Sequence, residues 1–440
     1  MKPTDPRPFA RSAAVLLAAL CASQALAQAT DPEPALDVHV QATYLRQMKP
    51  SFESPYAGPK SLGGARAGSY SFTGTAFLGV RAAPGLELYA NPEVTQGVPF
   101  SQLQGVAGFT NGELARTSGP EPTPYLARFF LRKTWNLDGE SQAQASDQNQ
   151  VRTSYSAERL VLTAGVLSVL DVFDTVDYSR DARTQFMNWS SLTYGAWDYP
   201  ADARGYTRGI ALEYVTPRIA LRAGRFALPR QSNGLRLDGQ IWRHFGDAGE
   251  LALPFTVAGC KGMLRALAFR NRAVMGSFED ALAAGGTPDV SRVRRLQSKS
   301  GLGVGAQVEL APAVGGYVRA AINDGRTETY AFTEIDRSLA AGVLAKGERW
   351  SRAGDSAGVA VYVNALAAAH RNYLAAGGQG FFLGDGRLNY ARERILEMFY
   401  SAQLRGEVWL SGGYQRIVNP GYNADRGPAN FYGLRLHANF

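Results

Sequence analysis

The segment FYGLRLHANF, residues 431–440, carries the pattern that decides the fold of this chain. Apolar and mostly polar residues alternate along it: Tyr432, Leu434, Leu436, Ala438 and Phe440 lie between Phe431, Gly433, Arg435, His437 and Asn439. Because successive side chains of a β-strand point to opposite faces, this repeat predicts a strand with one apolar face. That face points to a core in a soluble sandwich and to lipid in a membrane barrel. The number of such strands and the loops between them distinguish the two folds.

The same pattern recurs along the chain in short segments divided by turn residues. We predict strands at about 36–47, 68–81, 85–93, 123–135, 158–168, 205–215, 218–228, 236–246, 252–273, 299–310, 313–322, 328–345, 355–368, 391–403, 406–418 and 430–440. In the fourth segment, one face carries Tyr125, Ala127, Phe129 and Leu131, and the other carries Arg128, Arg132 and Thr134. An even number of alternating strands predicts an all-β fold, a transmembrane antiparallel β-barrel of sixteen strands.

The connections between these strands sort by length. Even-numbered strands lead into short turns such as Ala83-Pro84-Gly85 and Thr216-Pro217-Arg218. Odd-numbered strands lead into long loops at 94–122, 169–204, 274–298, 369–390 and 419–429. Outer-membrane barrels have short periplasmic turns and long extracellular loops, whereas a soluble sandwich has no reason to separate the two. The segment 136–157 is an exception, since it should be a periplasmic turn but is long and polar.

Polar side chains fall on the face of the strands that points away from lipid. They are Arg128, Arg132, Arg222, Glu397, Glu407, Gln415 and Arg435. Charged groups are rarely buried without partners, so a dry interior would be unfavourable and a water-filled lumen is predicted. After the N-terminal region no run of 18 apolar residues occurs, which excludes helical membrane spans.

The N-terminus has the features of a cleavable secretory signal. Lys2, Arg7 and Arg11 precede a short apolar core, and Ala25-Leu26-Ala27 offers small residues at a cleavage site. We therefore predict a signal peptide at 1–27, cleaved near Ala27, and one barrel domain at 28–440. Cys21 raises a lipoprotein alternative, which Leu20 disfavours because a lipoprotein signal has a small residue there.

The charge of the exported chain is mildly basic. Of the 46 Lys+Arg and 38 Asp+Glu, three basic residues and one acidic residue lie in the signal, which leaves a balance of +6. No basic arm or cluster appears, so nucleic acid is not an expected partner. Cys260 is the one cysteine after the signal, so an intrachain disulfide is not possible.

The loop from Asp171 to Pro200 is rich in aromatic and charged residues. Its first half has helical spacing, with Asp171 placed to cap the first turn. Folded into a pore, such a loop narrows the channel, and its Asp and Arg side chains determine what passes. Two alternatives remain for Asp171, Asp174, Asp177 and Asp181: a solvated helix face paired with Arg180 and Arg183, or a calcium site, although the glycine of a calcium loop is lacking.

Aromatic residues could contact a sugar by stacking on the apolar face of its ring. Trp189, Tyr194, Trp197, Tyr199 and Trp409 are the candidates, and the alternative for each is loop packing or the aromatic girdle of a barrel. No catalytic residue, cofactor or metal is predicted. The histidines His39, His244, His370 and His437 are isolated, and neither a G-x-S-x-G nor a P-loop motif occurs.

Several long motifs resemble the carbohydrate-selective porin family, porin B. They are DYSRDARTQFMNW at 177–189, GAWDYPADARG at 195–205, GDGRLNY at 384–390, NPGYNADRGP at 419–428, NPEVTQG at 91–97 and GFTNGE at 108–113. The resemblance implies a sixteen-stranded barrel that admits glucose and similar small sugars by passive, selective diffusion. It also implies a pore narrowed by helical segments of infolded extracellular loops, which match 99–110 and 171–189 here, and lined by Arg, Glu and aromatic side chains.

Combining this resemblance with the phase of the strands gives a set of candidate pore-lining and sugar-contacting residues. They are Arg128, Arg132, Asp171, Asp177, Arg180, Arg183, Asn188, Trp189, Trp197, Glu397 and Trp409. The expected location is the Gram-negative outer membrane. The expected partners are small sugars, outer-membrane lipid or lipopolysaccharide, and the barrel-assembly machinery, which would recognise the last strand with its terminal Phe440.

Three other functions remain open from the sequence. A porin for organic anions would use the positive balance of the chain. An outer-membrane barrel enzyme would need a Ser/His pair, which the sequence does not reveal. A soluble, secreted all-β binding module would be extracted without detergent.

Overall fold

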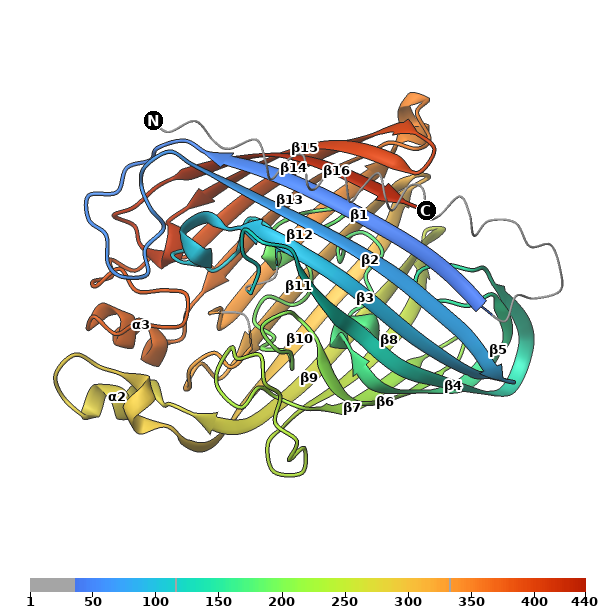
Figure 1. Cartoon of the computed structure of the whole chain (residues 1–440), viewed down its shortest axis with the longest axis horizontal. Helices are drawn as coiled ribbons and strands as arrows, with labels where there is room; N and C mark the ends of the chain where they lie inside the picture. The colour runs from blue at the N-terminus through green and yellow to red at the C-terminus, as the bar shows by residue number, and fades with distance from the viewer. Residues whose placement is uncertain (1–35, 115–116, 332–333) are drawn as a thin grey trace.

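The computed structural model describes residues 36–114, 117–331 and 334–440. Sixteen antiparallel strands form one closed barrel, in which each strand pairs with its neighbours in sequence and β16 pairs with β1 (Figure 1). The predicted signal at 1–27 lies outside the described residues. No helix of the described chain is long and apolar enough to cross a membrane.

The strands are β1 (Leu36–Lys49), β2 (Ala67–Ala83), β3 (Leu86–Val98), β4 (Thr123–Gln144), β5 (Thr153–Leu167), β6 (Thr207–Val215), β7 (Ala220–Phe226), β8 (Phe245–Val257), β9 (Cys260–Met275), β10 (Arg295–Ala311), β11 (Val314–Asn323), β12 (Arg337–Lys346), β13 (Ser356–Ala365), β14 (Glu393–Arg405), β15 (Val408–Val418) and β16 (Ala429–Asn439). Short helical turns lie in the loops: η1 (Phe100–Leu103), η2 (Val169–Asp171), η3 (Trp189–Ser191), α2 (Phe278–Ala283), η4 (Val290–Val293), η5 (Gly347–Trp350), α3 (Ala368–Ala375) and η6 (Pro420–Tyr422).

The last strand has the two faces that its sequence predicts. Leu434 is 55% exposed on the outer wall, whereas Arg435 and His437 are buried inside the barrel. Phe440 and Val40 exchange two backbone hydrogen bonds of 2.8 Å, which extend the pairing of β16 with β1. Closure leaves no free strand edge, so every strand satisfies its backbone groups within the sheet, as a membrane requires.

Loop length separates the two ends of the barrel, as predicted. The long loops gather at one end and the short turns at the other (Figure 1). We number the long connections loop 1 (50–66), loop 2 (99–122), loop 3 (168–206), loop 4 (227–244), loop 5 (276–294), loop 6 (324–336), loop 7 (366–392) and loop 8 (419–428). The segment 136–157 fits this pattern, because β4 and β5 extend into it and leave only a turn at 145–152. The count of sixteen and the sidedness of the loops are therefore both confirmed.

Three predicted strands have the wrong bounds. The segment 236–246 belongs mostly to loop 4, and 252–273 contains the turn between β8 and β9. That turn is formed by Ala258 and Gly259, both with positive φ. Its sequence lacks the Pro, Asn or Asp that usually marks a turn, so the apolar alternation predicts one continuous strand across it. In the twelfth predicted strand, residues 334–336 belong to loop 6 and β12 begins only at Arg337.

The predicted faces of β4 are wrong at its loop end. Leu126 and Phe129 both point outward, at 53% and 60% exposure, although residues three positions apart in a regular strand point to opposite faces. The pairing of β4 with β3 shifts at Pro92, which marks a β-bulge. Tyr125 consequently points into the barrel, where its hydroxyl donates to Glu93. Glu407, predicted to face the lumen, lies in the turn between β14 and β15.

The lumen is only partly open, because loops fold into it as the resemblance implies. Loop 3 folds into the barrel and buries Phe173, Phe186, Tyr194 and Trp197 in one apolar cluster with lumen-facing side chains of the strands. The expected helical segments at 99–110 and 171–189 are irregular chain with the short turns η1, η2 and η3. The open space that remains lies along one side of the barrel.

The outward face of β16 gives a prediction for stability. Leu434→Arg, near the middle of the strand, should lower the free energy of unfolding by about 2–4 kcal/mol, because an arginine at the bilayer midplane is unfavourable. Asn430→Arg, on the same face at the loop end, is the matched control and should change it by about 0–1 kcal/mol. Urea unfolding in lipid vesicles measures both, and equal effects would contradict the assigned membrane depth.

Candidate functional site

Two connected hollows lie between loop 3 and the wall formed by the first seven strands. The outer hollow, on the long-loop side, has an empty volume of about 740 Å³, and the inner hollow, toward the short turns, about 1750 Å³. We call the residues that line both hollows the neck: Arg128, Ser168, Arg180, Asp181, Arg183 and Leu192. A solute that passed from one hollow to the other would meet the side chains of the neck.

A bidentate ion pair holds one side of the neck. The Arg128 Nε and Nη2 atoms donate to Asp171 at 2.7 and 2.8 Å. Asp171 is positioned by a capping box at the start of η2, in which Leu170 N–H donates to the Ser168 side chain and Ser168 N–H donates to Asp171. Loop 3 is thereby fixed to β4 at the point where it enters the barrel.

A second group of ion pairs joins loop 2, loop 3 and the wall. The Arg183 Nε atom donates to Glu113 of loop 2 at 2.7 Å, and its Nη2 atom donates to Glu93 of β3 at 3.2 Å. Glu93 also accepts from the hydroxyl groups of Tyr125 and Tyr206. One guanidinium thus links three parts of the chain that are far apart in sequence, which rigidifies the outer side of the neck.

The inner hollow has its own paired charges on the strands. Arg132 lies 3.8 Å from Glu87 and donates to the carbonyl of Asn149, which belongs to the turn between β4 and β5. Arg222 donates to Glu213 at 2.8 Å across β6 and β7. The turn therefore folds back under the barrel, and its Val151 is fully buried with its N–H donating to Tyr89.

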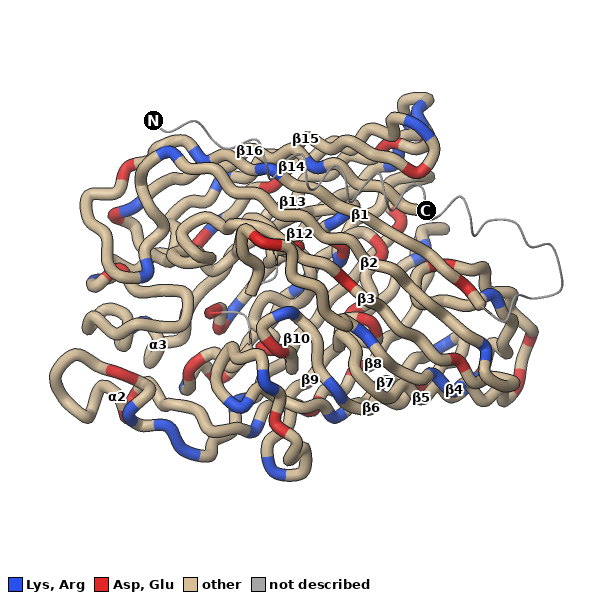
Figure 2. The backbone as a smooth tube through the Cα atoms, in the orientation of Figure 1, with Lys and Arg blue, Asp and Glu red and all other residues tan. Residues whose placement is uncertain are grey.

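Positive and negative side chains are balanced along the route. Among the described residues, the walls of the two hollows carry seven arginines and seven carboxylates, namely Arg128, Arg132, Arg159, Arg180, Arg183, Arg204 and Arg222 against Glu87, Glu93, Glu113, Asp171, Asp174, Asp181 and Glu213. Red and blue positions are accordingly interleaved inside the barrel in Figure 2. Such a wall offers donors and acceptors to a solute but little net charge.

Aromatic rings add an apolar component to the outer hollow. Trp189 stacks on Tyr199, with ring centroids 6.0 Å apart and an interplanar angle of 19°. The Arg204 guanidinium lies 4.3 Å from the centre of the Tyr125 ring, and the Arg128 guanidinium 5.1 Å from that of Tyr206. Aromatic faces beside fixed donors and acceptors are the usual composition of a site for a polar small molecule.

The ionisation of the loop carboxylates depends on these pairs. Burial alone would raise the pKa of Asp171, but the adjacent Arg128 holds it below its ordinary value. Burial raises the pKa of Glu113, and Arg183 only partly opposes this effect. Asp171 therefore remains a carboxylate, and the Arg128–Asp171 pair stays charged at neutral pH.

Six of the predicted site residues line the hollows: Arg128, Arg132, Asp171, Arg180, Arg183 and Trp189. The other five do not line either hollow: Asp177, Asn188, Trp197, Glu397 and Trp409. Asp177 accepts a hydrogen bond from Gln307 on β10. Trp197 is buried against Phe173 in the packed side of the lumen. Trp409 lies near the short turns, where its indole N–H donates to the carbonyl of Gly354.

Glu397 and Asn188 anchor loop 3 from behind. The buried Glu397 carboxylate of β14 accepts from the N–H groups of Met187 and Asn188 at 2.6 and 3.1 Å. The Asn188 side chain caps η3 by accepting from Ser190 N–H and donates to Gln415. Both residues therefore position the loop rather than the solute.

Glu393, the first residue of β14 and four residues before Glu397 on the same face, holds loops 2 and 8 in the same way. Its buried carboxylate accepts from the N–H groups of Ala107, Gly108 and Gly421 at 3.0, 2.8 and 2.9 Å. These bonds use the backbone donors of irregular chain that would otherwise be buried without partners. Two carboxylates of one strand thus hold three loops inside the barrel.

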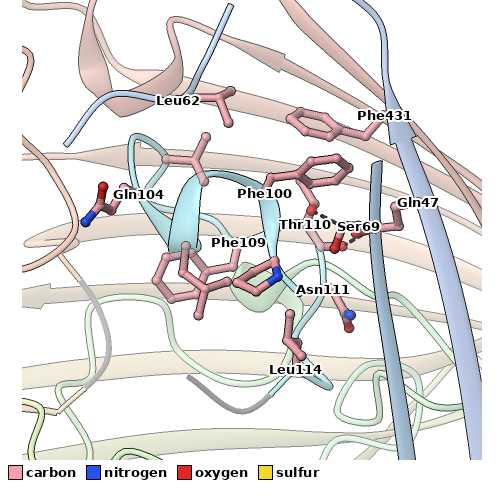
Figure 3. Close-up of a pocket in the computed structure, with 13 residues that line it drawn as sticks. Gln47, Leu62, Ser69, Phe100, Gln104, Phe109, Thr110, Asn111, Leu114 and Phe431 are labelled. Carbon is pink, nitrogen blue, oxygen red and sulfur yellow. Dashed lines mark hydrogen bonds between the residues drawn. The ribbon is translucent and has the colours of Figure 1, made fainter. Parts of the chain in front are cut away.

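Loop 2 also packs against the first and last strands. Figure 3 shows Phe100 of η1 facing Phe431 of β16, with ring centroids 5.4 Å apart, and Thr110 beside Gln47 of β1. The space left between them is a small cavity with an empty volume of about 320 Å³. Its lining is mostly apolar and belongs to the packing of loop 2, away from the neck.

The four aspartates of loop 3 do not converge on one point. Asp171 pairs with Arg128, Asp174 with Arg319, and Asp177 with Gln307. Asp181 accepts from the N–H of Arg183 and from the Thr184 hydroxyl. This arrangement corrects both alternatives, because the carboxylates neither share a calcium position nor form one solvated helix face.

Other residues of the outer hollow were not predicted as site residues: Glu93, Glu113, Tyr125, Arg204 and Tyr206. A signal for three of them was present, because Glu93, Glu113 and Arg204 lie in the motifs NPEVTQG, GFTNGE and GAWDYPADARG. Tyr125 had been placed on the lipid face, since strand alternation alone does not reveal a bulge.

Comparison with known proteins complements this geometry. The family model described as carbohydrate-selective porin, OprB family, matches residues 78–440. The chain is similar to the high-pH structure of Pseudomonas putida OprB, with a TM-score of 0.67 and 14% identity over 92% of this chain and 94% of that one. It also matches the low-pH structure of that protein, with a TM-score of 0.49 and 12% identity over 92% and 93%. A loop-L8 deletion mutant of Vibrio cholerae OmpT gives a TM-score of 0.48 and 11% identity over 92% and 100%. No curated protein sequence matches the chain.

Proposed function

The chain belongs to the carbohydrate-selective porin family, OprB, a family of outer-membrane sugar channels, and from this premise we propose that small neutral sugars cross it through the neck. In this proposal, glucose-like monosaccharides diffuse passively from the outer to the inner hollow along the wall of β2–β7. The chain makes and breaks no covalent bond of the solute. Size, hydrogen bonding and weak aromatic contact set the flux, because a channel must release what it binds.

The observation that supports this proposal is the balance of charge around the route. Seven arginines and seven carboxylates give a solute many hydrogen-bonding groups without a strong net potential. A neutral, hydroxyl-rich molecule gains from such a wall, whereas an organic anion would also meet the carboxylates. The stacked and largely buried rings of Trp189 and Tyr199 add an apolar part to the wall of the outer hollow, as in sites for sugars.

Swelling of proteoliposomes that contain the full chain tests the proposal. Monosaccharides, disaccharides and charged solutes of matched size are compared at equal osmolarity. We expect the fastest swelling with monosaccharides and slower swelling with organic anions of the same size. Equal rates for all solutes would contradict selectivity, and faster entry of the anions would favour the organic-anion alternative.

The neck gives a prediction for transport. Arg128→Ala should change the rate of glucose entry severalfold, because it removes a guanidinium from the neck and leaves Asp171 without its bidentate partner. Arg132→Ala, in the inner hollow, should have a smaller effect of the same kind. Arg349→Ala, on an exposed short connection, is the control and should leave the rate unchanged. Unchanged flux in Arg128→Ala, with normal barrel assembly, would show that sugars do not pass the neck.

We further propose how the chain is exported and assembled in the membrane. Residues 1–27 act as a cleaved export signal, and the barrel-assembly machinery recognises β16 with Phe440. N-terminal sequencing of the protein purified from outer membranes tests the first part, with a start near Gln28 expected. Replacement of Phe440 by a polar residue tests the second and should lower the yield of assembled barrel.

A further inference from the structure

Arginines are concentrated on the outer wall of the barrel near the long-loop end. Eight of them occupy outward-facing positions of the strands: Arg46, Arg208, Arg225, Arg270, Arg272, Arg337, Arg394 and Arg416. Toward the short turns, the outward positions of four of the same strands are apolar, namely Leu212, Leu221, Leu264 and Val343. The basic residues therefore lie on the side of the membrane that the long loops mark as extracellular.

Part of this basic band borders a hollow on the outside of the barrel. Loop 4 projects from the barrel body in Figure 1, and Figure 2 shows basic positions along it. The hollow has an empty volume of about 820 Å³ and is lined by Arg208 of β6, Val166 of β5 and four residues of loop 4: Arg230, Leu235, Arg236 and Leu237. Val166 and Arg208 are paired across the two strands. The hollow thus combines three guanidinium groups with three aliphatic side chains.

The guanidinium groups of these three arginines form no ion pair within the described chain. Among the described residues, no carboxylate oxygen lies within 4.0 Å of the guanidinium nitrogens of Arg208, Arg230 or Arg236, although other arginines of the wall are paired. Arg225, for example, makes a bidentate pair with Asp247 at 2.7 Å. Asp238 of loop 4 is close enough to Arg230 to interact with its charge, and its carboxylate is hydrogen-bonded to His244. Three exposed cations around one hollow outnumber this carboxylate and favour an anionic ligand.

We propose that this hollow binds the phosphorylated, acylated sugar headgroup of lipid A, the lipid of the outer leaflet. The arginines would bind phosphate oxygens as bidentate donors, and Val166, Leu235 and Leu237 would contact the upper part of the acyl chains. Trp242 of loop 4 is 79% exposed and lies near Arg225 of the basic band, as an aromatic residue at the membrane interface would. A free anion would use the arginines but not the aliphatic side chains, so the combination favours a lipid.

Native mass spectrometry of the full chain in detergent tests this proposal. The probes are diphosphoryl lipid A and the same lipid without phosphates. The triple variant Arg208→Gln/Arg230→Gln/Arg236→Gln should bind diphosphoryl lipid A about a hundredfold more weakly, since each basic residue near an anionic surface contributes roughly fivefold. The dephosphorylated lipid should bind weakly and equally to both proteins. Glucose swelling should be unchanged, because the hollow lies outside the barrel.

A second triple variant controls for loss of surface charge. Arg337→Gln/Arg394→Gln/Arg416→Gln removes the same charge from the band on β12, β14 and β15, and should keep the tight lipid A site. Equal weakening in both triple variants, or no weakening in the first, would overturn the proposal. Full competition by inorganic phosphate would also overturn it, because it would identify a free anion as the ligand.

A lysine variant covers the case in which the glutamine triple does not assemble. Arg208→Lys/Arg230→Lys/Arg236→Lys keeps the charge but lacks the bidentate geometry of arginine, so binding should weaken by roughly tenfold. Undiminished binding in the lysine variant of an assembled barrel would contradict the bidentate recognition. Heat-modifiable mobility on gels reports assembly in each case.

Discussion

Replacing Glu393 and Glu397 with alanine is expected to turn a selective channel into a wider one. The two buried carboxylates accept five hydrogen bonds from backbone N–H groups of loops 2, 3 and 8. Hydrogen bonds to a charged group contribute roughly 1.5–3 kcal/mol each, so the loops lose much of what holds them against β14. A sixteen-stranded barrel without infolded loops has an aqueous channel. Single-channel conductance should rise by roughly twofold or more, and trisaccharides should enter.

Planar bilayer recording and swelling with sugars of increasing size measure this effect. Glu407→Ala is the matched control, because it removes a glutamate from the exposed turn that follows the same strand. It should leave both conductance and the size limit unchanged. An assembled double variant with normal conductance would show that Arg319 and Arg435, which also bond to loop 3, hold it without the two carboxylates.

Arg180→Glu is expected to make the channel select for cations. Arg180 lies in the neck, and its replacement changes the local charge by two units on a wall that is otherwise balanced. Among the described residues no carboxylate pairs with its guanidinium, so the substitution leaves no buried acid without its partner. Narrow charged passages sustain potentials of several kT, and the ratio of potassium to chloride permeability should therefore rise on the order of fivefold.

Reversal potentials in a salt gradient measure the ratio, and swelling with glucose measures the neutral solute. Glucose entry should change less than twofold, because a neutral molecule does not sense the net charge. Arg349→Glu gives the same charge change on an exposed short connection and should not alter the ratio. A similar shift in both variants would mean that ions are selected at the mouth rather than at the neck.

The barrel could be predicted from the sequence because lipid and water impose a local rule. Outward positions within the apolar band of the membrane are mostly apolar, so the alternation along β16 is visible without any knowledge of its neighbours. The alternation does not predict turns or bulges, which are positions where the regular strand is interrupted. The turn at Ala258 and Gly259 and the bulge beside Pro92 are set by pairing between strands, and an apolar pattern continues through both.

The site was predictable only in part for a related reason. Arg128 and Arg183 could be identified because they are charged residues at lumen-facing or loop positions. The sequence does not reveal that a carboxylate accepts from a loop rather than facing a solute, so Glu397 resembled a pore residue. Trp197 is hidden in the packed half of the lumen for the same reason. Contacts between segments that are distant in the sequence decide these roles. The class of transported solute was predicted from the resemblance to a family and not from the pattern of residues.

Because loop 3 fills one side of the lumen, the inward residues of different strands have different roles. On β10–β15, inward residues such as Arg319 and Glu397 form hydrogen bonds to the backbone of loop 3 and fix its position in the lumen. On β2–β7, inward residues such as Glu93 and Arg132 line the two hollows, which form the proposed route of the sugar. Substitutions intended to change the transported solute can therefore be made at inward positions of β2–β7, while the inward residues of β10–β15 are kept to hold the loops.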